Sequence, residues 1–286
     1  MTQSNAGPAV EVRDLVKQYG TVTAVRGITF SLGRGTITAL LGGNGAGKTT
    51  TIAMLLGLVL PTSGHVRVLG EDMVRHRSRV LHRMNFESPY VNLPMRLTVK
   101  QNLITFARLY GVKCPKDRIA ELAEDLRLGD FLHRPAGTLS AGQKTRAALA
   151  KALINEPELL LLDEPTASLD PDTADWVREK LRTYAAARNA TILLASHNMS
   201  EVERMASRVI MMDRGLVVED GTAEALVNRY GRRNLEEVFI AIARRNGQSA
   251  GAGDPLSGDP ITGVGAAAAA PSGRDRKAQG GVAHVR

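Results

Sequence analysis

A glycine-rich segment directly after a short apolar run has the clearest pattern for chemistry. Residues 42–49 read G-G-N-G-A-G-K-T and follow the apolar residues 37–41. Glycines let the backbone curl so that successive amides point at phosphate oxygens, and a helix starting there adds its positive end. We expect Lys48 to neutralise the β- and γ-phosphates of a nucleotide and Thr49 to place a hydroxyl on Mg²⁺. A flexible glycine turn is the alternative, which the strand–loop–helix context disfavours.

A pair of acidic residues follows a second apolar run. Residues 159–164 read L-L-L-L-D-E, and four leucines in a row predict a strand buried on both faces. Asp163 would then end the strand beside the glycine loop, where it can hold the shell of the Mg²⁺ ion. Glu164 would lie at the carboxyl edge of the sheet, where open α/β sheets bind ligands, and could polarise an attacking water. Alone, such a pair is often a strand exit into solvent; together with the loop, the catalytic interpretation is favoured.

A third pattern, L-S-A-G-Q-K at 139–144, has two interpretations. Ser140 and Gln143 fit a helix capping box, which is a purely structural role. A capped helix start that contains Gly142 is also a second anion site on the same chain. From these residues alone, both interpretations stay open.

The elements around these residues alternate between strands and helices. Strands are predicted at 37–41, 158–163 and 190–195, and a hairpin at 208–218. Capping patterns at Thr98 and Asp170 predict helices that begin there. Residues 92–156 are typical of helix only, which suggests an inserted helical subdomain. The order predicts an α/β fold with a mainly parallel sheet.

Composition narrows the class of protein. Lys and Arg number 37 against 29 Asp and Glu, giving a net charge of +8, but no dense basic block occurs and aromatic residues are only 4%. We therefore expect no nucleic-acid partner. The single cysteine, Cys114, excludes an intrachain disulfide, and we expect a reducing compartment. The apolar stretch 52–60 is far shorter than the roughly 20 residues of a membrane span, and the first residues have no secretory pattern, so we expect a cytoplasmic protein.

Two compositional breaks predict the domain limits. Residues 1–8 are small and polar, and residues 247–286 are rich in Gly and Ala. Both segments are predicted to be disordered, which leaves one ordered domain at 9–245.

The order of these patterns resembles a known family. A phosphate loop, L-S-A-G-Q, L-L-L-L-D-E-P, S-L-D at 168–170 and S-H at 196–197 occur in the order found in the ATP-binding-cassette (ABC) ATPases. The resemblance covers roughly 9–230. It implies a P-loop NTPase core of the RecA-like α/β type, an N-terminal antiparallel β subdomain and an inserted α-helical subdomain at about 92–156.

The resemblance also implies roles for single residues. Tyr19 matches the aromatic residue that stacks on adenine, although a plain strand-end tyrosine is the alternative. His197 matches the histidine that contacts the γ-phosphate, and Glu164, His197 and Lys48 are the implied catalytic residues. Asp170 matches a loop that couples two sites across a dimer, and Ser140, Gly142 and Gln143 match the signature that touches ATP bound to the opposite subunit. The implied nucleotide-binding residues are Tyr19, Gly42, Gly43, Asn44, Gly45, Ala46, Gly47, Lys48, Thr49, Thr50, Ser140, Gly142, Gln143 and Asp170.

At the level of function, the resemblance implies an ATPase that uses ATP and Mg²⁺. Residues 196–206 and 234–243 are similar to the exporter branch of the family, whose membrane subunits are encoded separately. The expected partners are a second ATPase subunit, as a homodimer, and a permease that holds the protein at the inner face of the membrane. The stripe Leu235, Val238 and Ile242 is equally explained by a plain packing helix. A soluble non-transport ABC ATPase, a regulatory nucleotide-binding module and an importer subunit remain alternatives.

One departure from the family pattern concerns the metal. The family usually has Gln at the end of the strand before the helical insert, and residues 84–94, M-N-F-E-S-P-Y-V-N-L-P, contain none. The nearest candidates are Glu87 and Ser88. We expect the Ser88 hydroxyl to join Thr49 and Asp163 as a metal ligand, and Glu87 to add negative charge beside the phosphates.

Overall fold

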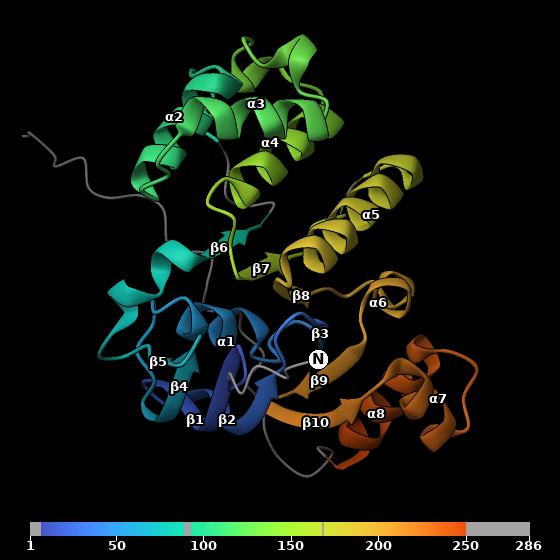
Figure 1. Ribbon diagram of the computed structural model, residues 1–286. Coiled ribbons are helices and arrows are strands. Elements are labelled where there is room, and N and C mark those ends of the chain that lie inside the picture. The colour runs from blue at the N-terminus through green and yellow to red at the C-terminus, as the bar shows by residue number, and fades with distance from the viewer. Residues whose placement is uncertain (1–6, 89–92, 168, 250–286) are drawn as a thin grey trace, which may run out of the picture. The chain divides into compact units, whose positions relative to one another are not determined.

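A six-stranded sheet forms the centre of the fold in the computed structural model, which describes residues 7–88, 93–167 and 169–249 (Figure 1). Its strand order is β10 (Leu216–Gly221), β9 (Arg208–Asp213), β3 (Ile37–Leu41), β8 (Thr191–Ala195), β7 (Leu159–Asp163) and β6 (Met84–Glu87). All neighbours are parallel except β9 and β10, which form the predicted hairpin. The predicted mainly parallel sheet is confirmed. The described residues all belong to one compact unit, Met1–Gly251.

A second sheet is built from the N-terminal part of the chain. It has the order β2 (Val22–Leu32), β1 (Val10–Tyr19), β4 (Ser63–Val68) and β5 (Glu71–Asp72), and every pair in it is antiparallel. This confirms the N-terminal antiparallel subdomain that the family resemblance implied.

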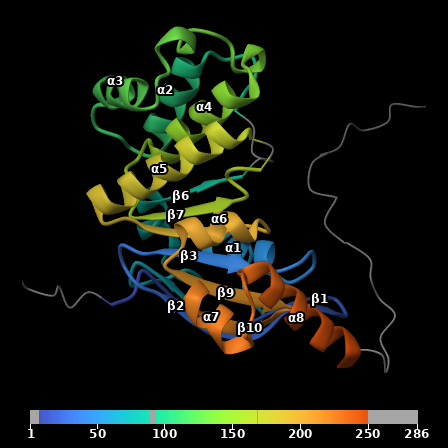
Figure 2. The same ribbon diagram turned by 90° about the vertical axis from the view of Figure 1, so that its right-hand side faces the viewer.

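Three helices lie between β6 and β7 in the chain: α2 (Val99–Leu109), α3 (Pro115–Asp125) and α4 (Ala141–Leu153). They gather at one end of the structure, as Figures 1 and 2 show. Both predicted capping boxes are present, with Thr98 and Gln101 at the start of α2 and Ser140 and Gln143 at the start of α4. The inserted helical subdomain is thereby confirmed.

The remaining helices surround the parallel sheet. They are α1 (Lys48–Leu55), α5 (Pro171–Arg188), α6 (Met199–Met205), α7 (Ala223–Tyr230) and α8 (Leu235–Ser249), with short 3₁₀ turns at Arg77–Arg79, Leu81–Arg83, Gly129–Phe131 and Ala136–Thr138. Among the described helices, none is long and apolar enough to cross a membrane. Helix α8 runs past residue 247, the predicted start of the tail, while residues 1–6 and 250–286 of the predicted disordered ends lie outside the described residues.

The core explains the run of four leucines in β7. Leu160 and Leu162 pack with α4, α5 and the helical subdomain, whereas Leu159 and Leu161 pack on the other face with α1 and the antiparallel sheet. A strand buried on both faces favours apolar side chains at every position inside the sheet. Its first polar side chain is Asp163, at the carboxyl end.

A third core cluster fixes the C-terminal helix. Leu235, Val238 and Ile242 are buried in a cluster that also contains residues of β3 and β9. This confirms the packing interpretation of the apolar stripe.

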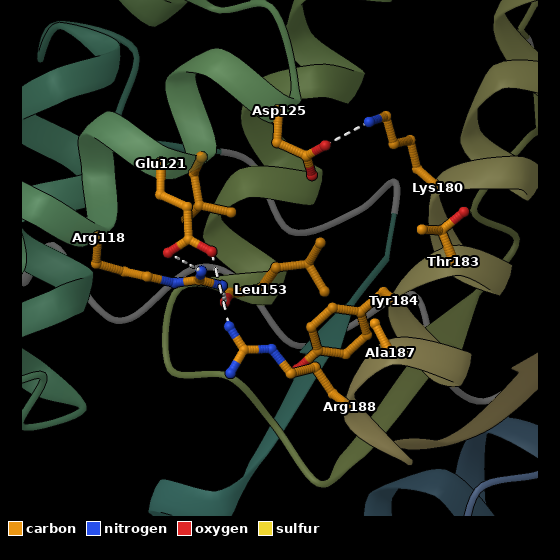
Figure 3. A pocket seen from close by; sticks show the side chains of 10 residues that line it. Arg118, Glu121, Asp125, Leu153, Lys180, Thr183, Tyr184, Ala187 and Arg188 are labelled. Atoms are coloured by element: carbon orange, nitrogen blue, oxygen red, sulfur yellow. Dashed lines mark hydrogen bonds and ion pairs between the residues drawn. The ribbon is translucent and has the colours of Figure 1, made fainter.

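A charged hollow lies between α3 of the helical subdomain and α5 (Figure 3). It has a volume of about 150 Å³. Arg118 and Arg188 lie 2.7 and 3.6 Å from the carboxylate of Glu121, and Lys180 pairs with Asp125. These cations pair with carboxylates that line the same hollow, and the ion pairs connect α3 to α5.

Candidate nucleotide site

The glycine loop connects the end of β3 to the start of α1, as the sequence predicted. Gly47 has φ of 99°, and a Cβ there would lie 2.7 Å from the carbonyl oxygen of Ala24. A Cβ on Gly42 would lie 2.6 Å from the carbonyl oxygen of Met212. Side chains at either position would collide with backbone, so only glycine fits. Because neighbouring strands approach the loop so closely, glycine is required at both of its ends.

Lys48 folds over the loop that precedes it. Its Nζ donates to the carbonyl oxygens of Gly42 at 2.7 Å and Gly43 at 3.2 Å. Burial lowers the pKa of Lys48, while the charges of Glu164 and Asp163 oppose this effect. These interactions indicate that three predicted site residues, Lys48, Asp163 and Glu164, lie close together. Of the two threonines that follow, Thr49 is exposed and Thr50 is buried, so the Thr49 side chain is the accessible one.

The acidic pair occupies the end of β7. Burial raises the pKa of Asp163, Glu164 raises it further, and Lys48 counteracts both. Glu164 has a left-handed backbone with φ of 52°, and its N–H donates to the carbonyl of Ala195 at 2.8 Å. Such a conformation costs a non-glycine residue of the order of 1–3 kcal/mol, so the surrounding contacts must hold Glu164 in place.

His197 lies directly against Glu164. Its Nδ1 is 2.5 Å from Oε1 of Glu164, and its backbone N–H donates to the same oxygen at 2.9 Å. The His197 side chain is 73% exposed, whereas that of Glu164 is only 18% exposed. With Nδ1 facing the carboxylate, Nε2 is the ring nitrogen left for a ligand.

The end of β6 departs from the expectation for Glu87. Its carboxylate lies 2.6 Å from Nζ of Lys151 on α4, and the two side chains are 12% and 5% exposed, respectively. Strand register places Glu87 beside Leu162, on the face that packs against the helical subdomain. The expectation that Glu87 adds negative charge beside the phosphates is therefore wrong, because Lys151 balances that charge. Burial nevertheless raises the pKa of Glu87, against the influence of Lys151. Ser88 is 4% exposed at the strand end.

The family signature and Asp170 form a second group. Ser140 accepts from the N–H of Gln143 at the start of α4, and a Cβ on Gly142 would lie 3.7 Å from Thr173. Thr173 belongs to the first turn of α5, where its N–H donates to Asp170 at 3.0 Å and lowers the pKa of that carboxyl group. The N-termini of α4 and α5 thus lie together, although Ser168 falls outside the described residues.

Tyr19 lies at the end of β1 and is 41% exposed. Nζ of Lys17 lies 4.8 Å from the centre of its ring. The next strand, β2, carries the Ala24 carbonyl that approaches Gly47. The hairpin of β1 and β2, which holds Tyr19, therefore packs against the glycine loop. An exposed ring in this position suits stacking, which stays a prediction.

Glu201, which lies near Glu164 through its contact with Ser196, had no role predicted from the sequence. Glu201 is 2% exposed, and its carboxylate accepts from the hydroxyls of Thr166 and Ser196. The spacing of Asn198 and Glu201 fits a capping box, which would have explained Glu201 without a further role. Asn198 does cap α6, but the Glu201 carboxylate binds the two hydroxyls. Its burial could not be read from this spacing.

The fold and the site define a class of protein. A glycine loop between a strand and a helix, with acidic residues at the end of an adjoining parallel strand, is the arrangement of the P-loop nucleoside triphosphatases. The described chain adds an antiparallel sheet and a helical insert to that core.

Comparison with known proteins narrows the class to a family. The profile described as "ABC transporter" matches residues 25–167. A "Nod factor export ATP-binding protein I" of Burkholderia orbicola is 38% identical over 232 residues, covering 80% of this chain and 76% of that protein. A bacitracin transport ATP-binding protein of Bacillus licheniformis is 36% identical, covering 79% of this chain and 74% of that protein. The chain belongs to the ABC transporter family, as an ATP-hydrolysing cassette.

Solved structures agree with this assignment. One described as "Structure of ATP binding subunit of ABC transporter" has a TM-score of 0.76 and 28% identity, and covers 82% of this chain and 99% of that chain. A nucleotide-free ABC cassette matches with a TM-score of 0.71 at 23% identity, which supports the fold.

Proposed function

We propose that this chain is the ATP-hydrolysing subunit of a membrane exporter and that Lys48, Asp163, Glu164 and His197 form its hydrolytic site. The observation that supports this proposal is the convergence of these side chains at the ends of the neighbouring strands β3, β7 and β8. Parallel strands present their carboxyl ends at one edge of the sheet, where ligands bind in such folds. The relatives described as export and transport ATP-binding proteins support the exporter role.

The nucleotide would bind with its phosphates in the loop 42–47. Successive backbone amides and the start of α1 favour phosphate oxygens, and Lys48 would exchange its loop carbonyls for the β- and γ-phosphates. Tyr19 would stack on the adenine ring.

The residues at the end of β7 fit a magnesium ion. Hard oxygen donors suit Mg²⁺, and Thr49 offers an exposed hydroxyl directly after Lys48, which interacts electrostatically with Asp163 and Glu164. The raised pKa of Asp163 indicates a negative charge that a cation would stabilise. Thr49, Asp163 and Ser88 would hold the ion, which neutralises charge on the phosphates when bound. Among the described residues, no cluster of three or more His, Cys, Asp or Glu side chains could hold a metal.

Hydrolysis would proceed by attack of water on the γ-phosphorus. The new bond joins the water oxygen to phosphorus, and the bond from phosphorus to the bridging oxygen breaks. Glu164 would accept the proton that the water loses, and ADP would leave with the bridging oxygen. His197 would fix the carboxylate through Oε1, which leaves its Nε2 available to the phosphate. Ser140, Gly142 and Gln143 of a second copy would complete the site, in a twofold dimer that ATP closes.

The test is a pair of substitutions with a matched control. Glu164→Gln should bind ATP but lower kcat by about 100-fold or more, since general base catalysis contributes at least this much. Lys48→Ala should weaken ATP binding, because the cation that faces the phosphates is lost. Glu203→Gln is the control, because its exposed carboxylate on α6 contacts Leu235 and not the site. ATP binding, phosphate release and ATP-dependent dimerisation are measured for each protein. Hydrolysis at the parental rate by Glu164→Gln would show that Glu164 is not the base.

A further inference from the structure

Behind Glu164 lies a small buried network of hydroxyl and carboxylate groups. Glu201 on α6 is 2% exposed, Ser196 is fully buried and Thr166 is 8% exposed. Thr166 follows Glu164 by two residues, and Ser196 precedes His197. Glu201 therefore bridges the two segments that carry the proposed base and its histidine partner.

The contacts of Glu201 are specific for each carboxylate oxygen. Oε1 accepts from the Thr166 hydroxyl at 2.5 Å, and Oε2 accepts from the Ser196 hydroxyl at 3.0 Å. Among the described residues, no salt bridge involves Glu201. A buried carboxylate without a cation depends on its hydrogen bonds, so both hydroxyl protons are committed to it.

Ser196 has one proton and two carboxylates within reach. Its Oγ lies 3.0 Å from Oε2 of Glu201 and 3.4 Å from Oε2 of Glu164. The backbone N–H of Asn198 donates to the same Oγ at 3.1 Å, which occupies one of its lone pairs. Because a hydroxyl donates only once, the shorter contact directs the proton to Glu201.

The consequence falls on Glu164. Its Oε1 already faces the ring Nδ1 of His197 at 2.5 Å and the backbone N–H of the same residue at 2.9 Å, which leaves Oε2 as the oxygen that can accept from water. We propose that Glu201 is a positioning residue for ATP hydrolysis. It accepts the hydrogen bond of the Ser196 hydroxyl and thereby keeps Oε2 of Glu164 free for the attacking water. This inference rests on the proposed role of Glu164 as the base.

Glu201→Gln tests the proposal with little change of shape. One of its two terminal atoms becomes an NH₂ donor. The 3.0 Å contact with Ser196 suits N–H···O geometry, whereas the 2.5 Å contact with Thr166 suits only O–H···O. The amide would therefore donate to Ser196, whose own proton would turn to Oε2 of Glu164. We expect kcat to fall by about fivefold or more, while KM for ATP stays within about twofold, because the base is impaired and the nucleotide contacts are not.

Removal of the hydroxyl separates this mechanism from simple damage. The double variant Glu201→Gln with Ser196→Ala has no hydroxyl to occupy Glu164, so its kcat should return to within about twofold of Ser196→Ala alone. A loosened α6 would instead lower Tm and would not be rescued. Glu203→Gln on the same helix is the matched control, with parental kcat and at most a small fall in Tm expected, because its amide oxygen can still accept from the Leu235 N–H.

Each outcome decides the matter. Parental kcat in Glu201→Gln, or a loss that Ser196→Ala does not restore, overturns the proposal. If Glu201→Gln does not fold, Ser196→Ala alone decides: a kcat loss above about fivefold would mean that Glu164 needs this hydroxyl. Glu164→Gln is assayed in parallel. If it hydrolyses ATP at the parental rate, the proposed base is wrong; if it is inactive while Glu201→Gln is unaffected, only the role of Glu201 fails.

Discussion

Glu164 is held in its left-handed conformation from several sides. Its backbone N–H binds Ala195 and its carboxylate binds His197, while Ala167 donates to its carbonyl at 3.1 Å. Strain at one residue persists only when surrounding contacts over-determine it. Here the contacts come from the end of β8 and from the turn after β7. A mobile glutamate could not hold a water molecule in line with a bound phosphate. This rigidity therefore suits a residue that must orient the attacking water.

The pairing of Glu87 with Lys151 bears on the metal site. The carboxylate is committed to Lys151, so Glu87→Gln should leave the Mg²⁺ concentration for half-maximal ATPase activity within about twofold of the parent. Asp163→Asn, the positive control, should raise it, because a charged oxygen ligand is lost. Ser88→Ala should raise it as well if its hydroxyl holds the ion. A clear shift in Glu87→Gln would contradict the assignment of its charge to Lys151.

The same residues show what local sequence could and could not predict. Apolar runs, which are local patterns, predicted the strands that carry the site: the glycine loop, Asp163, Glu164 and His197 all lie at or after their ends. The structure brings Lys48, the acidic pair and His197 together. The partner of Glu87 is 64 residues away in the chain, on a helix that only tertiary packing brings to β6. Likewise, Thr166 and Glu201 are separated by 35 residues. Buried polar pairs of this kind have no periodic pattern in a single sequence.

At the scale of elements, polar contacts connect the helical subdomain to the edge of the parallel sheet. Lys151 of α4 also donates to the Phe86 carbonyl at 3.1 Å. Asn85 donates to Asn155 at 2.7 Å and accepts from the Tyr110 hydroxyl at 3.2 Å. Because α4 begins at the signature residue Ser140, these contacts set the position of the signature relative to β6. The capping pattern at Ser140 predicted the start of α4 and the family resemblance implied a strand before the helical insert, but neither predicted this connection between them.

Loss of Lys151 tests the strength of this connection. Lys151→Met should destabilise the fold by about 3 kcal/mol, because it leaves the buried Glu87 carboxylate without its cation. The double variant with Glu87→Gln should recover more than half of that loss. Urea unfolding measures the free energies, with Lys180→Met as the control, since that more exposed pair should contribute less than about 1 kcal/mol. Additive effects of the two substitutions would mean that the pair is not coupled.

For the whole molecule, the site described on one chain has two separate parts. Lys48, Glu164 and His197 form one group, and the N-termini of α4 and α5, which hold Gly142 and Asp170, form the other. In the proposed dimer, the second group of one copy faces the first group of its partner. Such a twofold arrangement makes closure depend on ATP, which contacts both copies, and hydrolysis would remove the link. Coupling to a membrane partner would follow from this opening and closing.

A variant that stays in the ATP-bound, closed dimer allows the membrane partner of this chain to be identified. Glu164→Gln should accumulate with ATP bound, so a tagged form captured from gently solubilised native membranes with ATP present should retain its partners. We expect a membrane protein with several spans in near-equal amount, because the proposed exporter needs a membrane subunit and the similar proteins are described as export and transport ATP-binding proteins. Lys48→Ala, which should bind ATP more weakly, is the control for nucleotide-dependent capture. A soluble or ribosomal partner, with the chain absent from the membrane fraction, would contradict the exporter proposal while leaving the hydrolytic site intact. Mass spectrometry of the captured complex distinguishes these results, and an identified membrane subunit would then define which compounds to test as transported substrates.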